Sequence, residues 1–122
     1  MAQPPLTLVL GASENANRYS YRAAHMLKQH GHAVWLTGRR LGSIGDTPIY
    51  THFPEPGSVD TLTLYVGPAH QSAFAADVEK LHPRRIIFNP GTENPEWQAR
   101  LQAQGIAVEE ACTLVLLSIG QY

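Results

Sequence analysis

The chain has 122 residues, of which 43% are hydrophobic and 16% charged, and this balance predicts a single globular domain over residues 1–122. Its formal net charge is −1 and its nine lysines and arginines form no long basic run, which argues against a general nucleic-acid-binding protein. One cysteine cannot form an internal disulfide, and no segment reaches the ~20 apolar residues of a membrane span. Because we also find no signal peptide, we expect a cytoplasmic protein without a membrane partner.

Apolar runs and helical periodicity predict that strands and helices alternate along the chain. The predicted strands occupy residues 6–10, 32–38, around 49–50, 61–66, 84–91 and 106–111. The predicted helices occupy residues 20–31, 69–83, 93–105 and, less clearly than the others, 112–122.

Local signals support several of these elements. The run Leu6–Leu10 is apolar apart from one threonine, which is typical of a strand that is buried on both faces. The first helix carries apolar residues at one-turn spacing, namely Tyr19, Ala23, Met26 and Leu27. The helix after residue 93 has a full set of boundary residues, with Asn94 as N-cap, Pro95 at the first helical position and Gly105 at the end.

This alternation predicts an α/β fold in three layers, with a doubly wound parallel sheet between two layers of helices. We expect the strand order 3-2-1-4-5 with a short last strand. The order changes direction between the strands that end at Leu10 and Val66, and ligands of such sheets bind at that point, beyond the carboxyl ends of the strands. Residues that follow strands are therefore the candidates for a site.

The first strand leads into a turn and a helix, an arrangement that can hold a phosphate group. Small residues there let backbone N–H groups approach an anion, and polar side chains can add donors. The candidate residues are Gly11, Ala12, Ser13, Asn15 and Arg18. The segment lacks the second and third glycines of the dinucleotide fingerprint, and an ordinary strand-to-helix turn is the alternative interpretation.

The second strand is followed by Gly38, Arg39 and Arg40. An NAD site places an acidic residue here to accept from the ribose hydroxyls, whereas arginines favour a phosphate on that ribose. NADP carries such a phosphate on the 2′ oxygen and coenzyme A on the 3′ oxygen. The alternative interpretation is that both arginines are solvated surface residues that bind no ligand.

Two further strand ends are predicted to meet the same edge of the sheet. One could offer a flat surface and an amide donor to a ligand, through Val66, Gly67, Pro68 and Gln71. The other could leave its backbone groups accessible to a ligand, at Asn89, Pro90 and Gly91. Each of these segments could equally consist of ordinary loop residues or helix-capping residues.

Taken together, residues 11–27, 59–68, 86–96 and 111–122 resemble the stand-alone CoA-binding proteins of the succinyl-CoA synthetase α-subunit type. The resemblance implies a Rossmann-like fold with coenzyme A, or an acyl-CoA, as ligand. It places Gly11, Ala12, Ser13, Asn15 and Arg18 around the pyrophosphate and Arg40 near the 3′-phosphate. It places Val66, Gly67 and Pro68 by the adenine or the pantetheine, Asn89, Pro90 and Gly91 along the pantetheine arm, and Cys112 near the thiol. The segment after the second strand departs from the family pattern, as does Ala16, where many members have proline.

No catalytic constellation accompanies these residues. The six histidines lack the spacing of a metal site, and the adjacent Glu109 and Glu110 would face opposite sides of a strand. Synthetase chemistry would need a phosphorylated histidine from another domain. We therefore expect a small CoA-binding protein, and both a protein partner and a homo-oligomer are compatible with the sequence. The alternatives are an NADP-dependent oxidoreductase and a non-binding relative that serves as an interaction module.

Overall fold

A computed structural model describes residues 5–122 of the chain. Seven strands form its sheet: β1 (Leu6–Leu10), β2 (Ala33–Thr37), β3 (Gly42–Ile44), β4 (Thr47–Tyr50), β5 (Val59–Leu64), β6 (Arg85–Phe88) and β7 (Ala107–Glu110). Five helices accompany them: α1 (Tyr19–Gln29), α2 (Pro68–Gln71), α3 (Ala75–Leu81), α4 (Pro95–Ala103) and α5 (Thr113–Ser118).

The strands follow the order β3-β4-β2-β1-β5-β6-β7. All neighbouring pairs are parallel except β3 and β4, which are antiparallel. The predicted order is therefore confirmed from β4 to β7, and β3 is an additional edge strand. Only a short strand around Ile49 was predicted in this region. A tight turn at Gly45, whose φ is +61°, pairs that strand with its predecessor as a hairpin.

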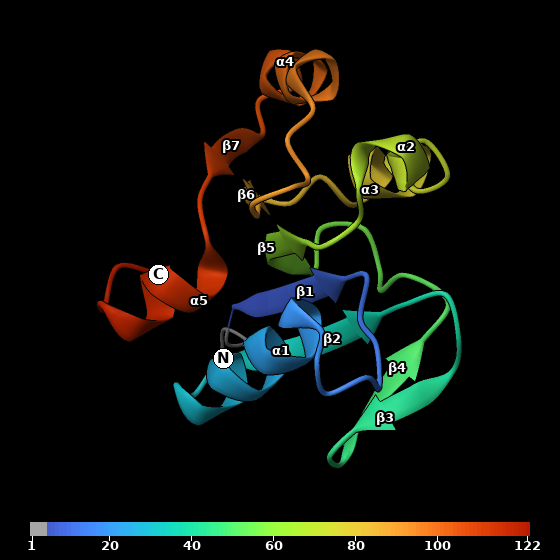
Figure 1. Ribbon diagram of the computed structural model, residues 1–122. Helices are drawn as coiled ribbons and strands as arrows, with labels where there is room; N and C mark the ends of the chain where they lie inside the picture. The colour runs from blue at the N-terminus through green and yellow to red at the C-terminus, as the bar shows by residue number, and fades with distance from the viewer. Residues whose placement is uncertain (1–4) are drawn as a thin grey trace.

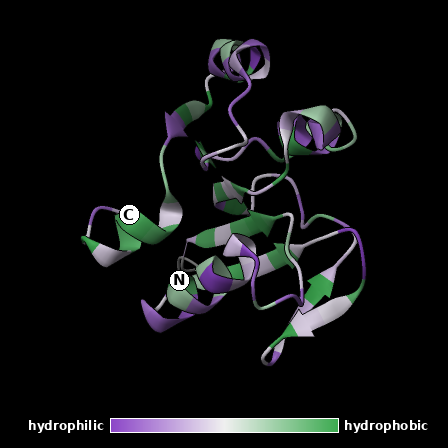
Figure 2. Cartoon of the chain, viewed as in Figure 1, coloured by the Kyte–Doolittle hydropathy of each residue, from purple (hydrophilic) through white to green (hydrophobic). Residues whose placement is uncertain are grey.

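Helices cover both faces of the sheet (Figure 1), which confirms the three-layer α/β class. One core lies between the sheet and the helices α3 and α4, and it includes Leu62, Phe88 and Trp97. The other lies between the sheet and the helices α1 and α5, and it includes Leu36 and Leu117. Figure 2 shows the central strands as largely hydrophobic and the outer helices as mixed, as expected for strands buried on both faces.

Two details of the predicted helices are wrong. Tyr19 is 66% exposed, because the buried face of α1 is centred on Ala23, Ala24 and Leu27. The predicted helix over residues 69–83 is interrupted between α2 and α3, where the chain turns after Gln71. The ambiguous C-terminal segment does form a helix, α5.

Candidate functional site

The carboxyl ends of β4, β2, β1, β5 and β6 lie at one edge of the sheet (Figure 1). The order changes direction between β1 and β5, where Leu10 is in register with Leu64. We call this side of the sheet the carboxyl edge. It is formed by the segments that follow these strands, residues 11–18, 38–41, 51–53, 65–71 and 89–94.

Backbone contacts hold the first two of these segments together. The N–H groups of Gly11 and Ala12 both donate to the carbonyl of Thr37, at 2.9 and 3.0 Å. A Cβ atom on Gly11, whose φ is +96°, would lie 2.8 Å from the carbonyl oxygen of Tyr65, and one on Gly38 would lie 2.3 Å from that of Ala12. Both positions therefore require glycine, which explains the glycine that follows each strand.

The loop between β1 and α1 is shaped by its own polar side chains. The N–H of Asn15 donates to Ser13 Oγ at 3.1 Å, and the N–H of Asn17 donates to Asn15 Oδ1 at 3.0 Å. Arg18 is the N-cap residue of α1, and no side chain caps the helix. The first-turn N–H groups of α1 are therefore open to an anion, whose charge the helix dipole would also favour.

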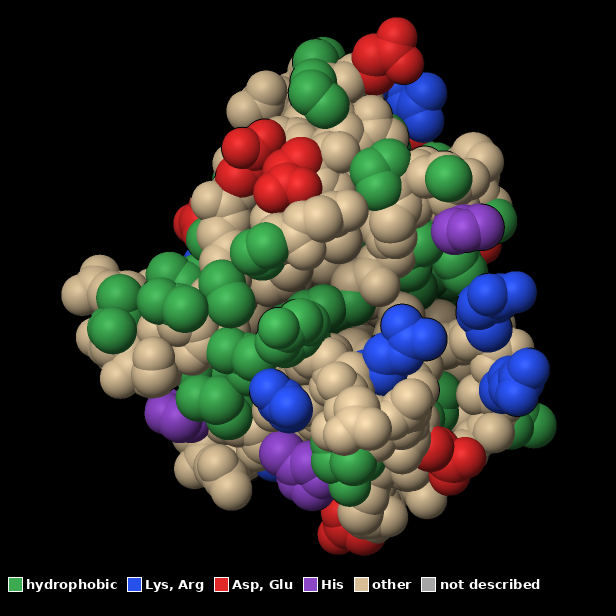
Figure 3. Space-filling view, viewed as in Figure 1, with side chains coloured by type: hydrophobic (Ala, Val, Ile, Leu, Met, Phe, Trp, Pro, Cys, Tyr) green, Lys and Arg blue, Asp and Glu red, His purple; other side chains and the backbone are tan. Residues whose placement is uncertain are grey.

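Four arginines around this loop have no acidic partner within residues 5–122. Arg18, Arg39 and Arg40 follow strand ends and are exposed, and Arg22 is exposed one helical turn after Arg18. The ion pairs of the described chain use other cations: Lys28 with Asp46, Arg84 with Asp60, Arg85 with Glu109 and Arg100 with Glu79. Figure 3 shows Lys and Arg side chains beside the connection that follows β2. Arg22 was not predicted from the sequence, although its i+4 spacing from Arg18 was a usable signal.

Glu14 was also missed, and it joins the loop to the edge hairpin. Its Oε2 accepts a hydrogen bond from the N–H of Ser43 at 3.0 Å. A Cβ atom on Gly42 would lie 2.5 Å from its carboxyl carbon. The carboxylate is thus held beside β3 by a neutral donor, and it keeps its negative charge there. No local pattern could have indicated a contact across 29 positions.

Two predicted site residues are buried in hydrogen-bond networks. Gln71 is 2% exposed, and its Nε2 donates to the carbonyls of Val66 and Thr92 at 2.9 and 2.7 Å, while its Oε1 accepts from Asn94. The network therefore fastens the end of β5 to the loop after β6. Because both N–H groups of the Gln71 amide are taken, this side chain offers a ligand no free donor.

Asn89 is 1% exposed and links β5, β6 and α5. Its Nδ2 donates to Thr63 Oγ1 and to the carbonyl of Leu64, and its Oδ1 accepts from the N–H of Thr113. Asn89 thereby brings the start of α5, with Cys112, to the carboxyl edge. Direct contact of Asn89 with a ligand stays a prediction, as it does for Pro90 and Gly91, which are exposed beside it.

Cys112 is half-buried and precedes α5. Nearby, the Tyr65 hydroxyl is buried and has no hydrogen-bond partner within residues 5–122. The hydroxyls of Thr63 and Thr113 are bonded to each other at 2.8 Å. Burial raises the pKa of Tyr65 to about 12, so this residue is a neutral phenol at physiological pH and no general base.

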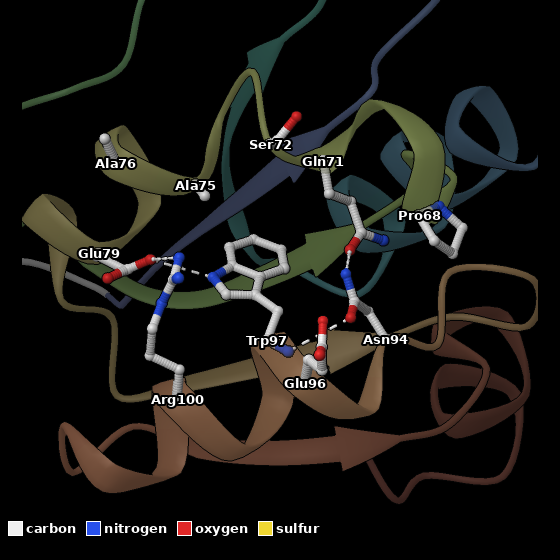
Figure 4. A pocket seen from close by; sticks show the side chains of 10 residues that line it. All are labelled: Pro68, Gln71, Ser72, Ala75, Ala76, Glu79, Asn94, Glu96, Trp97 and Arg100. Carbon is white, nitrogen blue, oxygen red and sulfur yellow. Dashed lines mark hydrogen bonds and ion pairs between the residues drawn. The ribbon is translucent and has the colours of Figure 1, made fainter.

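A groove of about 820 Å³ separates α2 and α3 from α4 and begins at the carboxyl edge with Pro68, Gln71 and Asn94 (Figure 4). Gln71, Asn94, Glu79, Trp97 and Arg100 are engaged with one another there. Glu79 accepts from Trp97 Nε1 at 3.1 Å and from Arg100 at 2.6 Å. The groove therefore presents an ion pair that is already formed, in contrast to the unpaired arginines of the carboxyl edge.

Residues 5–122 contain neither a metal-binding cluster nor a membrane-spanning helix. No group of three or more His, Cys, Asp or Glu residues in this part of the chain could hold a metal ion. None of the helices described here has the length and apolar character that crossing a membrane requires.

The family described as "CoA binding domain" matches residues 6–118, and no curated protein matches the chain. A crystal structure of an uncharacterized protein is similar to the chain with 42% identity and a TM-score of 0.92, over 99% of this chain and 100% of the other. The protein cell-free ID.343 from Thermus thermophilus has 20% identity and a TM-score of 0.83, over 98% and 91%. A hypothetical protein from Pyrococcus horikoshii OT3 has 17% identity and a TM-score of 0.81, over 93% and 81%. The last two similarities concern the fold alone.

Proposed function

The chain belongs to the CoA binding domain family, and on that ground we propose that it binds coenzyme A, free or acylated, at the carboxyl edge of its sheet without catalysing a reaction. Coenzyme A carries a pyrophosphate, a ribose 3′-phosphate and an uncharged pantetheine arm. A site for it needs cations at two separate places and an open, largely neutral path between strand ends.

The observation that carries this proposal is the set of unpaired arginines. The pyrophosphate would meet Arg18 and the open first turn of α1, because the N–H groups of Gly11 and Ala12 already donate to the Thr37 carbonyl. Arg39 and Arg40, after β2, lie where a ribose phosphate would extend from it. All three arginines are exposed and form no ion pair within residues 5–122, although the chain has ten acidic residues that could have paired with them. Cations without partners are available to an anionic ligand at no cost in broken ion pairs.

The pantetheine arm would cross to the other half of the edge. Val66 contacts the turn at Gly11, and Gly67, Pro68, Pro90 and Gly91 continue from there with little side-chain bulk. Cys112 would lie near the thiol or acyl group at the far end of this path.

Calorimetric titration of the protein with CoA, dephospho-CoA, NADP and NAD tests the proposal. We expect CoA to bind more tightly than dephospho-CoA by roughly 1.5–3 kcal/mol, the value of a hydrogen bond to a charged group. Arg40→Ala should abolish that difference. Arg84→Ala, which removes the same charge from a residue paired with Asp60, is the matched control and should leave it intact.

Each other outcome has a definite meaning. If NADP binds more tightly than CoA, the arginines serve a nicotinamide cofactor and the proposal is wrong. If none of the four compounds binds, the chain is a relative that has kept the fold and lost the ligand. If Arg40→Ala leaves the difference between CoA and dephospho-CoA unchanged, the 3′-phosphate lies elsewhere.

A further inference from the structure

Three aromatic rings gather where β2 and β4 approach the carboxyl edge. Trp35 belongs to β2, Tyr50 ends β4, and His52 follows two residues later; we call them the aromatic cluster. The ring centroids of Trp35 and Tyr50 lie 4.5 Å apart, those of Tyr50 and His52 4.9 Å, and those of Trp35 and His52 5.7 Å. Trp35 and Tyr50 are half-buried and His52 is exposed. Such distances are typical of rings in direct contact.

Hydrogen bonds fix the aromatic cluster beside the arginines that follow β2. Tyr50 is in register with Thr37, and its carbonyl accepts from the N–H of Gly38 at 2.9 Å. Thr37 Oγ1 accepts from Trp35 Nε1 at 3.1 Å and donates to the carbonyl of His52 at 3.0 Å. The polar edge of the indole is thereby satisfied within the protein. The cluster is therefore preorganised immediately next to Arg39.

Core packing accounts for only part of this arrangement. Trp35 packs against the core under α3, but His52 is exposed and gains nothing from that core. His52 also lines a cavity of about 550 Å³ between the loop Thr51–Pro56 and α3, which is within the size range of ligand pockets, roughly 300–1,000 Å³. The exposed ring of the cluster thus has open space beside it.

We propose that the aromatic cluster is the platform on which the adenine base of CoA stacks, while Arg39 and Arg40 bind the 3′-phosphate of the same nucleotide. This inference rests on the proposed function and specifies its nucleotide half. Ligands of doubly wound sheets extend along the edge to both sides of the point where the strand order changes direction. With the pyrophosphate at the loop after β1, the adenosine lies over β2 and β4, and Val66–Pro68 are left to the pantetheine arm.

Fragments of CoA separate the two halves of the site. Adenosine 3′,5′-bisphosphate contains the base and the 3′-phosphate, and 4′-phosphopantetheine contains neither. We expect His52→Ala to weaken binding of CoA and of adenosine 3′,5′-bisphosphate by roughly 5- to 150-fold, the range of one base–aromatic stacking contact. Binding of 4′-phosphopantetheine should not change. His52→Phe, which keeps an aromatic ring, should restore the affinity. His30→Ala, which removes an exposed histidine at the end of α1 and outside the carboxyl edge, is the control.

Tryptophan fluorescence gives a second, independent measurement. Trp35 lies within the cluster, whereas Trp97, on the buried side of α4, is 5% exposed and supplies a constant background. CoA and adenosine 3′,5′-bisphosphate should quench the emission, and 4′-phosphopantetheine should not. If wild-type protein binds CoA but His52→Ala binds it equally well and the emission is unchanged, stacking on the cluster is refuted and the proposed function stands. If wild-type protein binds no CoA, both are refuted.

Discussion

Replacing Asn89 with alanine should destabilise the fold strongly, because Asn89 holds three elements together. Its side chain makes hydrogen bonds of 2.8 Å to Thr63 Oγ1, 2.9 Å to the Leu64 carbonyl and 2.9 Å to the Thr113 N–H. Thr63 Oγ1 would keep its bond to Thr113 Oγ1. The Leu64 carbonyl and the Thr113 N–H would each lose a partner inside the protein.

Each buried group that is left without a partner costs roughly 1–3 kcal/mol, so the two together predict a loss of about 2–6 kcal/mol in the free energy of unfolding. A domain of 122 residues has a total of roughly 6–18 kcal/mol, at about 0.05–0.15 kcal/mol per residue. At the middle of both ranges, a loss of about 4 from about 12 kcal/mol, Asn89→Ala still folds, with a clearly lower urea midpoint and an unchanged slope.

Urea denaturation followed by circular dichroism measures this loss. Asn17→Ala is the matched control, because Asn17 is exposed, and it should stay within about 0.5 kcal/mol of the wild type. Asn89→Asp keeps an acceptor for Thr113 but places a carboxylate oxygen against the Leu64 carbonyl, so it should also be destabilised at neutral pH. If Asn89→Ala unfolds within about 0.5 kcal/mol of the wild type, the network does not contribute as argued here.

Three further predictions concern other parts of the structure. Gly38→Ala should lower both the free energy of unfolding and the affinity for CoA, because the new Cβ would lie 2.3 Å from the Ala12 carbonyl oxygen and the two strand ends would have to separate. Thermal unfolding measures the first effect and calorimetry the second. An unchanged melting temperature would contradict this prediction. Tyr65→Phe should unfold at an equal or higher urea concentration, because it removes a buried hydroxyl without a partner. The stability of the wild type should also fall as pH rises from 10.0 towards 12, because the Tyr65 hydroxyl ionises in the unfolded state over that range and stays neutral in the folded state. Hydrogen bonds from Gln104, Arg100 and Trp97 lower the pKa of the Glu79 carboxyl in the fold, so its contribution is present above pH 4.5, the ordinary value, and is lost as pH falls below it. Urea midpoints measured on both sides of that pH should differ less in Glu79→Gln than in the wild type, and equal differences would contradict the assignment.

Short-range signals in the sequence determined most of the architecture. Apolar runs located β1 and β5, and alternation with helices implied a parallel sheet that changes direction between them. Asn94 does cap α4, where its Oδ1 accepts from the Trp97 N–H, and Pro95 is the first helical residue. These features depend on residues that lie close together along the chain, so the local sequence contains the information needed to predict them.

Only the tertiary structure decided how the strand ends are joined and which side chains are free. The sequence could suggest that Asn89 and Arg40 belong to one edge, but not that one is fully hydrogen-bonded and the other unpaired. Glu14 meets Ser43 across 29 positions, and Trp35 meets His52 across 17. Such contacts depend on strand order and register, which bring distant segments within hydrogen-bond reach only after the sheet has formed. The chemistry of the carboxyl edge is therefore a property of the fold, although each of its residues can be found in the sequence.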